Sequence, residues 1–129
     1  MEVKLFLIIL VCMLVIDVIW WGFLAKNFYK EEMKNIGRFK GGNFDVKIIP
    51  TVILYILMTL GLMYFVNPKS GIEISNLFRG AFLGLLMYGV YDLTNYALLR
   101  DFSLKLAAID MVWGSFLLGI VSFIVGAFR

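Results

Sequence analysis

Four long apolar stretches, separated by more polar connections, dominate the pattern along this chain. They cover about Lys4–Ala25, Ile48–Val66, Phe78–Leu99 and Leu106–Phe128, and each has about 19 to 23 residues. At 1.5 Å of rise per residue, a helix of that length crosses a hydrocarbon core of roughly 30 Å. The pattern therefore predicts an all-α integral membrane protein, a four-helix bundle that forms a single transmembrane domain over residues 1–129.

The connections contain residues that end or begin helices. In the first connection, Phe28, Tyr29, Met33 and Ile36 have spacings that predict a helix lying on the membrane surface, which the pair Gly41–Gly42 then ends. Ser75 or Asn76 is expected to cap the third helix and Ser103 the fourth, because their side-chain oxygens accept from unpaired backbone N–H groups. The connection 100–103 is short, so we expect helices three and four to be antiparallel neighbours.

Small residues mark the faces along which the helices are expected to pack. Gly80 and Gly84 form a Gly-x-x-x-Gly pair on the third segment, and small residues recur every three or four positions on the fourth. The latter are Ser115, Gly119, Ser122 and Gly126. Such residues let helix backbones approach closely in a membrane. We interpret them as contacts within the bundle, with a homodimer as the alternative use.

The composition narrows the chemistry. The chain is 62% hydrophobic, has no histidine and has one cysteine, Cys12, so carboxylate, tyrosine and lysine side chains are the candidate proton carriers. No Cys- or His-based metal site is predicted, and no cofactor. A divalent ion held by carboxylates alone is only weakly indicated. Nothing in the sequence indicates a redox, nucleotide or nucleic-acid function.

Positive charges are distributed unevenly between the two ends of the predicted bundle. Eight of the twelve Lys and Arg residues lie in the first and third connections, and four lie at the opposite end. The positive-inside rule then places those two connections in the cytoplasm and both termini outside. We expect the lipid bilayer, and not nucleic acid, to be the partner of these basic residues.

Three aspartates, Asp17, Asp92 and Asp110, lie inside the apolar segments. A charged side chain at the centre of a membrane helix costs roughly 2.5 to 3.5 kcal/mol on insertion scales, so such residues face a bundle interior, a partner or a cavity. Asp17 is eight residues before Ala25, Asp92 is eight before Arg100, and Asp110 is five after Lys105. All three are therefore expected at a similar depth, roughly 7 to 12 Å from the end that carries connections one and three.

Aromatic and amide side chains accompany these acids. The pattern Asp-x-x-Trp occurs twice, as Asp17 with Trp20 and as Asp110 with Trp113, and residues three apart share a helix face. On the third segment, a polar face runs through the apolar helix beside Asp92. The predicted binding or proton-exchange site therefore consists of Asp17, Asp92, Asp110, Asn95, Tyr91, Trp20 and Trp113.

Two interpretations of this polar layer compete. In the structural one, each aspartate bonds an indole, a tyrosine, Asn95 or Arg100, and the layer fixes helix packing. In the functional one, crowded carboxylates bind a cation or exchange it for a proton, with aromatic faces adding cation–π attraction. We favour the functional interpretation because three acids are more than helix register needs.

The motifs also carry a family resemblance. The chain resembles the bacterial family of predicted membrane proteins called domain of unknown function 2177. The motifs that carry the resemblance are, in order, Asp17-x-x-Trp20, Phe28-Tyr29, Gly80-Ala-Phe-x-Gly84, Tyr88-x-x-Tyr91-Asp-Leu-Thr-Asn95 and Asp110-x-x-Trp113-Gly114. This resemblance covers nearly the whole chain, and it implies four spans and a bacterial inner-membrane setting. Two departures are minor: Trp21 doubles the first tryptophan, and Phe102 stands where an aromatic residue, often tryptophan, is usual.

These observations favour a small transporter or channel-like protein that binds or moves a cation or a small organic solute. Its aspartates would bind the solute or exchange protons, and we expect it to work as a homodimer. A membrane-embedded enzyme acting on a lipid, with two carboxylates as acid and base, is the first alternative. The lack of histidine and of a serine or cysteine nucleophile motif argues against it. The second alternative is a structural or accessory subunit whose aspartates meet cations of a larger partner.

Overall fold

The computed structural model describes residues 2–129, and most of them are helical. In chain order, the first half contains helix α1 (Glu2–Ile19), the π-helical turn η1 (Trp20–Leu24), helix α2 (Lys26–Glu32) and strands β1 (Phe39–Lys40) and β2 (Asn43–Phe44). The second half contains helix α3 (Ile48–Gly61), the π-helical turn η2 (Leu62–Val66), and helices α4 (Ile74–Leu98) and α5 (Leu104–Phe128).

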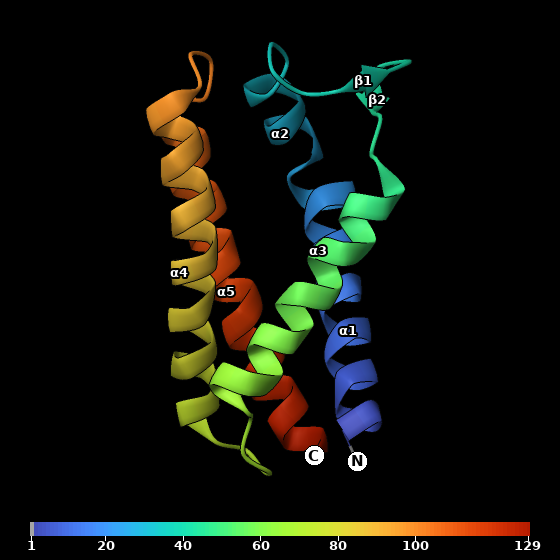
Figure 1. The fold of residues 1–129 in the computed structure, drawn as a ribbon, viewed down its shortest axis with the longest axis vertical. Helices are drawn as coiled ribbons and strands as arrows, with labels where there is room; N and C mark the ends of the chain where they lie inside the picture. The colour runs from blue at the N-terminus through green and yellow to red at the C-terminus, as the bar shows by residue number, and fades with distance from the viewer. Residues whose placement is uncertain (1) are drawn as a thin grey trace.

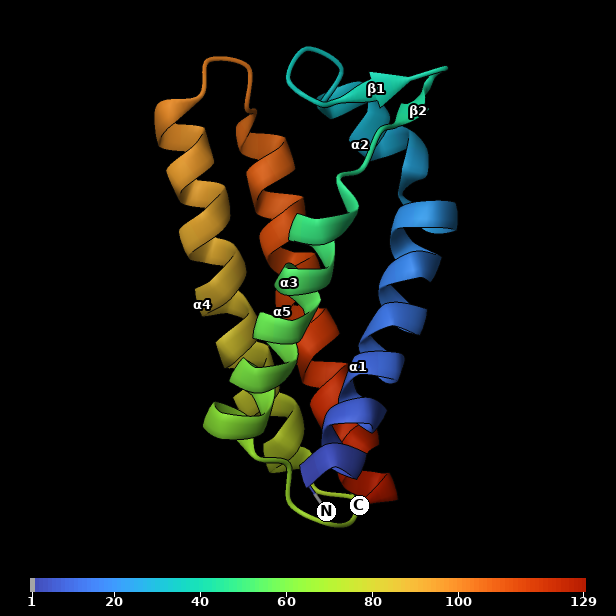
Figure 2. The ribbon, with the colours of Figure 1, turned by 45° about the vertical axis from the view of Figure 1, so that its right-hand side comes forward.

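The long helices run lengthwise, and the two ends of the molecule differ. Helices α4 and α5 lie side by side, α1 lies beside α5, and α3 crosses obliquely so that its lower end approaches α4 (Figures 1 and 2). The short helix α2, the β1–β2 hairpin and the α4–α5 connection are at one end, and both termini are at the other. Connections one and three therefore lie together.

Three helical stretches of residues 2–129 are long and apolar enough to cross a membrane: Glu2–Leu24, Ile48–Val66 and Leu104–Phe128. Helix α4 matches α5 in length, with 25 residues each, but Arg79, Asp92 and Asn95 make it less apolar. Large apolar side chains are exposed along all four long helices. A surface of this kind is stable in lipid and not in water.

Glycines bring α4 and α5 into close contact, which confirms the predicted packing role. A Cβ added at Gly84 would lie 2.2 Å from the carbonyl oxygen of Gly114, and one added at Gly80 would lie 2.2 Å from Ser122 Oγ. Gly114 in turn accommodates the ring of Tyr88. Because a side chain at these positions would separate the two helices, the glycines set the distance between them.

Helix α3 is packed much less tightly. Within Ile48–Gly61, Met58 and Thr59 are the buried residues, whereas Leu54 and Leu57 are 51% and 60% exposed. The main core lies between α1, η2 and α5, where Ile9, Leu62 and Leu117 are fully buried. One face of α3 is therefore left without a protein neighbour along most of its length.

The helix ends confirm one prediction made from the sequence and overturn two others. Ser103 accepts from Leu106 N at 2.9 Å and caps α5 as predicted. The predicted cap of the third helix is wrong: α4 starts after Glu73 without a side-chain cap, and Asn76 instead exchanges two hydrogen bonds with the backbone of Lys69. The surface helix is shorter than predicted, because the chain after α2 forms a hairpin.

Candidate site of buried aspartates and aromatic residues

Asp17 is held by two hydrogen bonds at the end of α1. Its Oδ1 accepts from Trp113 Nε1 at 2.9 Å, and its Oδ2 accepts a short hydrogen bond from the Tyr55 hydroxyl. The side chain is 4% exposed. Both oxygens are therefore satisfied by donors from α5 and α3, so this carboxylate ties three helices together.

Asp110 is held by a tyrosine from the short helix α2. The Tyr29 hydroxyl donates to Asp110 Oδ1 at 2.7 Å and accepts from Trp20 Nε1 at 3.1 Å. Burial, with a further contribution from Asp110, raises the pKa of Tyr29 above its usual value of 10.0. Tyr29 therefore remains protonated near neutral pH and keeps donating to Asp110.

Asp92 differs from the other two aspartates. It is 0% exposed, and neither carboxylate oxygen has a hydrogen-bond partner among residues 2–129. Residues 2–129 contain two ion pairs, Lys34–Glu31 and Arg38–Asp45, and both are exposed. No basic side chain of the described structure therefore neutralises Asp92.

Asp92 and Asp110 share a small cavity near the end that carries α2. Its volume is about 40 Å³, and its lining is mostly aromatic and aliphatic: Trp21, Tyr29, Met33, Tyr91, Asp92, Phe102, Leu106 and Asp110. One water needs roughly 10 to 15 Å³ of such space, so the cavity has room for a small cationic group and little else. The acids are thus the polar groups of an otherwise largely apolar chamber.

Stacked aromatic rings connect the Asp17 and Asp110 regions. Trp20 stacks on Trp113, with ring centroids 4.4 Å apart and planes 6° from parallel, and Trp21 stacks on Tyr29 at 3.9 Å. Trp20 and Trp21 belong to the π-helical turn η1, which ends where Ala25 N donates to Trp20 O. Such turns are frequent at functional sites, and here the turn brings the indoles of Trp20 and Trp21 into one layer.

The structure places most of the sequence-predicted residues in this layer. Asp17, Trp20, Asp110 and Trp113 belong to the hydrogen-bonded and stacked network. Tyr91 lines the cavity with Asp92 while remaining 56% exposed. Asn95 is half-buried one helical turn beyond Tyr91 and is not among the residues that line the cavity in the described chain.

Sequence reasoning missed two tyrosines of the network. Tyr55 lies eight residues after Lys47, which is the depth of the aspartates, so the same count applied to the second segment indicates it. Tyr29 belongs to the motif pair Phe28-Tyr29, but nothing in that pair indicates a contact with Asp110. Its spacing predicts a surface contact, whereas the structure buries it to 1% exposure against Asp110.

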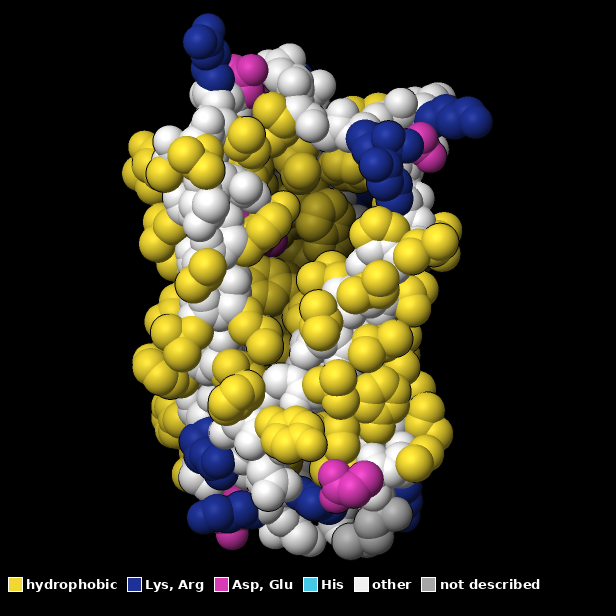
Figure 3. Space-filling view, viewed as in Figure 1, with side chains coloured by type: hydrophobic (Ala, Val, Ile, Leu, Met, Phe, Trp, Pro, Cys, Tyr) yellow, Lys and Arg dark blue, Asp and Glu magenta, His cyan; other side chains and the backbone are white. Residues whose placement is uncertain are grey.

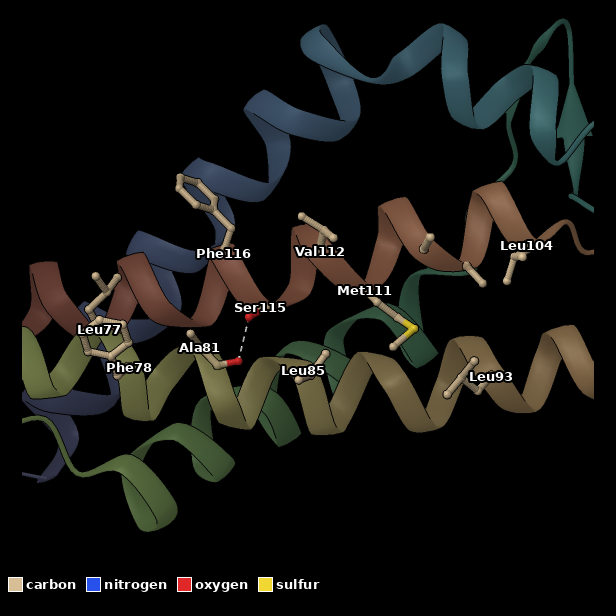
Figure 4. A pocket seen from close by; sticks show the side chains of 12 residues that line it. Leu77, Phe78, Ala81, Leu85, Leu93, Leu104, Met111, Val112, Ser115 and Phe116 are labelled. Carbon is tan, nitrogen blue, oxygen red and sulfur yellow. Dashed lines mark hydrogen bonds between the residues drawn. The ribbon is translucent and has the colours of Figure 1, made fainter.

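A second, larger depression lacks free polar chemistry. The groove between α4 and α5 has a volume of about 640 Å³ and is lined by side chains such as Phe78, Leu85, Val112 and Phe116 (Figure 4). Its one hydroxyl, that of Ser115, donates to the backbone oxygen of Ala81 at 2.9 Å. We therefore place the candidate site at the aspartates and not in this groove.

The fold and the site together define a helical integral membrane protein with buried aspartates, without a cluster of three or more metal-ligating His, Cys, Asp or Glu side chains within residues 2–129. The chain belongs to the family described as Predicted membrane protein (DUF2177), whose model matches residues 2–127. This confirms the resemblance found in the motifs. Comparisons with curated proteins and with solved structures gave no match.

Proposed function

We propose that this protein binds a cation between Asp92 and Asp110 and exchanges it for a proton as part of transport across the membrane. The observation that carries this proposal is the buried Asp92 carboxyl group, both of whose oxygens lack a partner in the described structure. An isolated carboxylate in an apolar interior is so costly that it either takes up a proton or acquires a positive neighbour. Asp92 is thus suited to alternate between these two states.

The surrounding groups support a cation over other ligands. Asp110 adds a second acid to the cavity, and the rings of Trp21, Tyr29 and Tyr91 provide faces for cation–π attraction. Tyr29 holds Asp110 in place through its hydroxyl. We assign Asp17 a positioning role, because its oxygens are already occupied by Tyr55 and Trp113.

We also propose how the chain lies in the membrane. Helix α4 would be the fourth span, because it matches α5 in length and packs along it through Gly80 and Gly84. The excess of basic residues at the end bearing α2 would place that end in the bacterial cytoplasm and both termini outside the inner membrane. Four helices rarely enclose a transport pathway alone, so we propose that two copies of the chain form a homodimer. Native mass spectrometry measures whether the purified protein is a dimer.

Tryptophan fluorescence offers a direct test of cation binding. All three tryptophans of the chain, Trp20, Trp21 and Trp113, lie in the site layer, so their emission should respond to occupancy. We expect titration with methylammonium, Na⁺ or K⁺ to change the emission of the wild type, and Asp92→Asn to weaken that response by at least roughly tenfold. Asp101→Asn, which changes an exposed aspartate, is the matched control.

Transport is tested in proteoliposomes with the cation that binds. We expect its flux to depend on pH and to be lost in Asp92→Asn but not in Asp101→Asn. If the flux and its pH dependence are unchanged in Asp92→Asn, the proposed role of this carboxyl group is wrong.

A further inference from the structure

The end of the cavity that faces connections one and three is closed by α2. Tyr29 packs there in a buried cluster with Ala25, Phe102, Leu106 and Ala107. Trp21 packs against this cluster and stacks on Tyr29. A hydrated ion that approaches along the helix axes from this end therefore meets packed aromatic and aliphatic side chains.

The side of the molecule between α3 and α4 is open instead. The C-terminal end of α3 meets the middle of α4, where a Cβ added at Gly61 would lie 2.5 Å from Met87 Cε. Above this contact the two helices diverge (Figure 1). The space-filling view has a deep hollow there, with an acidic side chain visible inside it (Figure 3). Tyr91 lies one turn above Met87, lines the cavity and is 56% exposed.

Hydrophobic side chains form the walls of this hollow (Figure 3). On α3, Leu54 lies seven residues before Gly61, hence on the same helix face, and is 51% exposed. We call the opening between α3 and α4, with Leu54 on one wall and Tyr91 on the other, the lateral cleft. In a bilayer it opens toward lipid and not toward water.

We propose that the cation of this site is the headgroup of an amphiphile, a primary ammonium on a hydrocarbon chain, which enters from the lipid through the lateral cleft. This inference rests on the proposed function and adds the ligand class and its route. The ammonium binds between Asp92 and Asp110, and the chain lies along the apolar walls. The end of the cavity that faces connections one and three is closed, and the lateral cleft opens toward lipid. This arrangement favours an amphiphile over a free hydrated ion.

Size and depth favour a primary ammonium. A cavity of about 40 Å³ admits an –NH₃⁺ group with its three hydrogen-bond donors, whereas a trimethylammonium group is bulkier and has none. Asp92 lies eight residues from Arg100, roughly 12 Å along the helix, so the headgroup is drawn only a short way below the membrane interface. The hydrocarbon chain then stays at the depth of the acyl region.

Native mass spectrometry of the full chain in a non-ionic detergent tests the inference with defined probes. We expect dodecylamine to bind at least about tenfold more tightly than methylammonium, because its chain is removed from water, and more tightly than dodecyltrimethylammonium. Asp92→Asn should remove dodecylamine binding. Leu54→Trp should weaken it by narrowing the cleft, whereas Leu7→Trp, at an equally exposed leucine of α1, should not.

The outcomes separate this inference from the proposed function. If methylammonium and dodecylamine bind equally and Asp92→Asn abolishes both, the ligand is not an amphiphile but the cation site stands. Failure of the wild type to bind any of the cations overturns both. Equal effects of Leu54→Trp and Leu7→Trp overturn the route. A wild-type dimer that takes up no dodecylamine, together with a monomeric Leu54→Trp, makes the cleft an interface between copies.

Discussion

Asp17 and Asp92 are both buried aspartates on long apolar helices, but their surroundings give them different uses. Asp17 receives donors from Trp113 and Tyr55 on both oxygens, whereas Asp92 receives none from the described residues. A carboxylate with its hydrogen bonds complete stabilises the packing of its helices, and one without partners is a cost to the fold. The comparison teaches that burial alone does not mark an acid as a binding group, whereas a buried carboxylate without donors has both oxygens left for a ligand.

Replacing each aspartate by leucine should give the largest difference in stability between the Asp17 and Asp92 variants. Asp17→Leu leaves the Trp113 N–H and the Tyr55 hydroxyl without an acceptor, which should cost roughly 2 to 6 kcal/mol of unfolding free energy. Asp92→Leu removes an unpartnered polar group and should be neutral or stabilising by roughly 1 to 3 kcal/mol. Unfolding in mixed micelles measures both, and equal destabilisation would contradict the comparison.

The two tyrosines offer a milder version of the same test. Tyr55→Phe removes one donor from Asp17 and should lower stability by about 1.5 to 3 kcal/mol without weakening cation binding. Tyr29→Phe removes the donor to Asp110 and should weaken binding, because Asp110 lines the cavity. Paired measurements of unfolding and of tryptophan fluorescence check this, and a binding defect confined to Tyr55→Phe would reverse the assignment.

Helix spacing should affect the Asp92 side more than the Asp17 side. Gly84→Ala forces α4 away from the backbone of Gly114, which should cost roughly 1 to 3 kcal/mol and weaken binding between Asp92 and Asp110. Gly22→Ala is the control, since its added Cβ meets only Val18 Cγ1 at 3.9 Å. Unfolding and cation titration measure the two effects, and a harmless Gly84→Ala would show that the helices can adjust.

The smallest expected effect concerns the cap of α5. Ser103 accepts from Leu106 N and donates to Glu32 Oε1 at 2.6 Å, so it fixes the start of α5 and joins it to α2. Ser103→Ala should cost about 1 kcal/mol. Ser103→Thr retains both the acceptor for Leu106 N and the donor to Glu32, and it should recover most of that stability in the same unfolding assay.

Local chemistry explains why parts of the fold could be predicted. The close contacts of Gly84 and the cap at Ser103 follow from residue type and position, because each depends on neighbours along one or two helices. The predicted cap at Ser75 or Asn76 was wrong because the Asn76 side chain forms hydrogen bonds with the Lys69 backbone instead. That choice depends on how the preceding loop folds back, which local propensity does not encode.

The site could be anticipated in its acids but not in their partners. Counting residues from the connections gives Asp17, Asp92 and Asp110 a common depth, and the same count extends to Tyr55. The inward position of Tyr29 depends on the π-helical turn that follows α1 and on a hydrogen bond to a residue 81 positions away. No local pattern specifies such a contact.

The sequence by itself determined that this is a helical membrane protein of its family with acids inside its apolar segments, because hydrophobic length and residue type act locally. Only the tertiary structure decided that Asp17 has donors for both oxygens, that Asp92 has none among the described residues, and that α3 diverges from α4. These depend on which side chains of distant helices meet. In lipid, such contacts are set by close packing and hydrogen bonds between particular residues and not by the hydrophobic pattern.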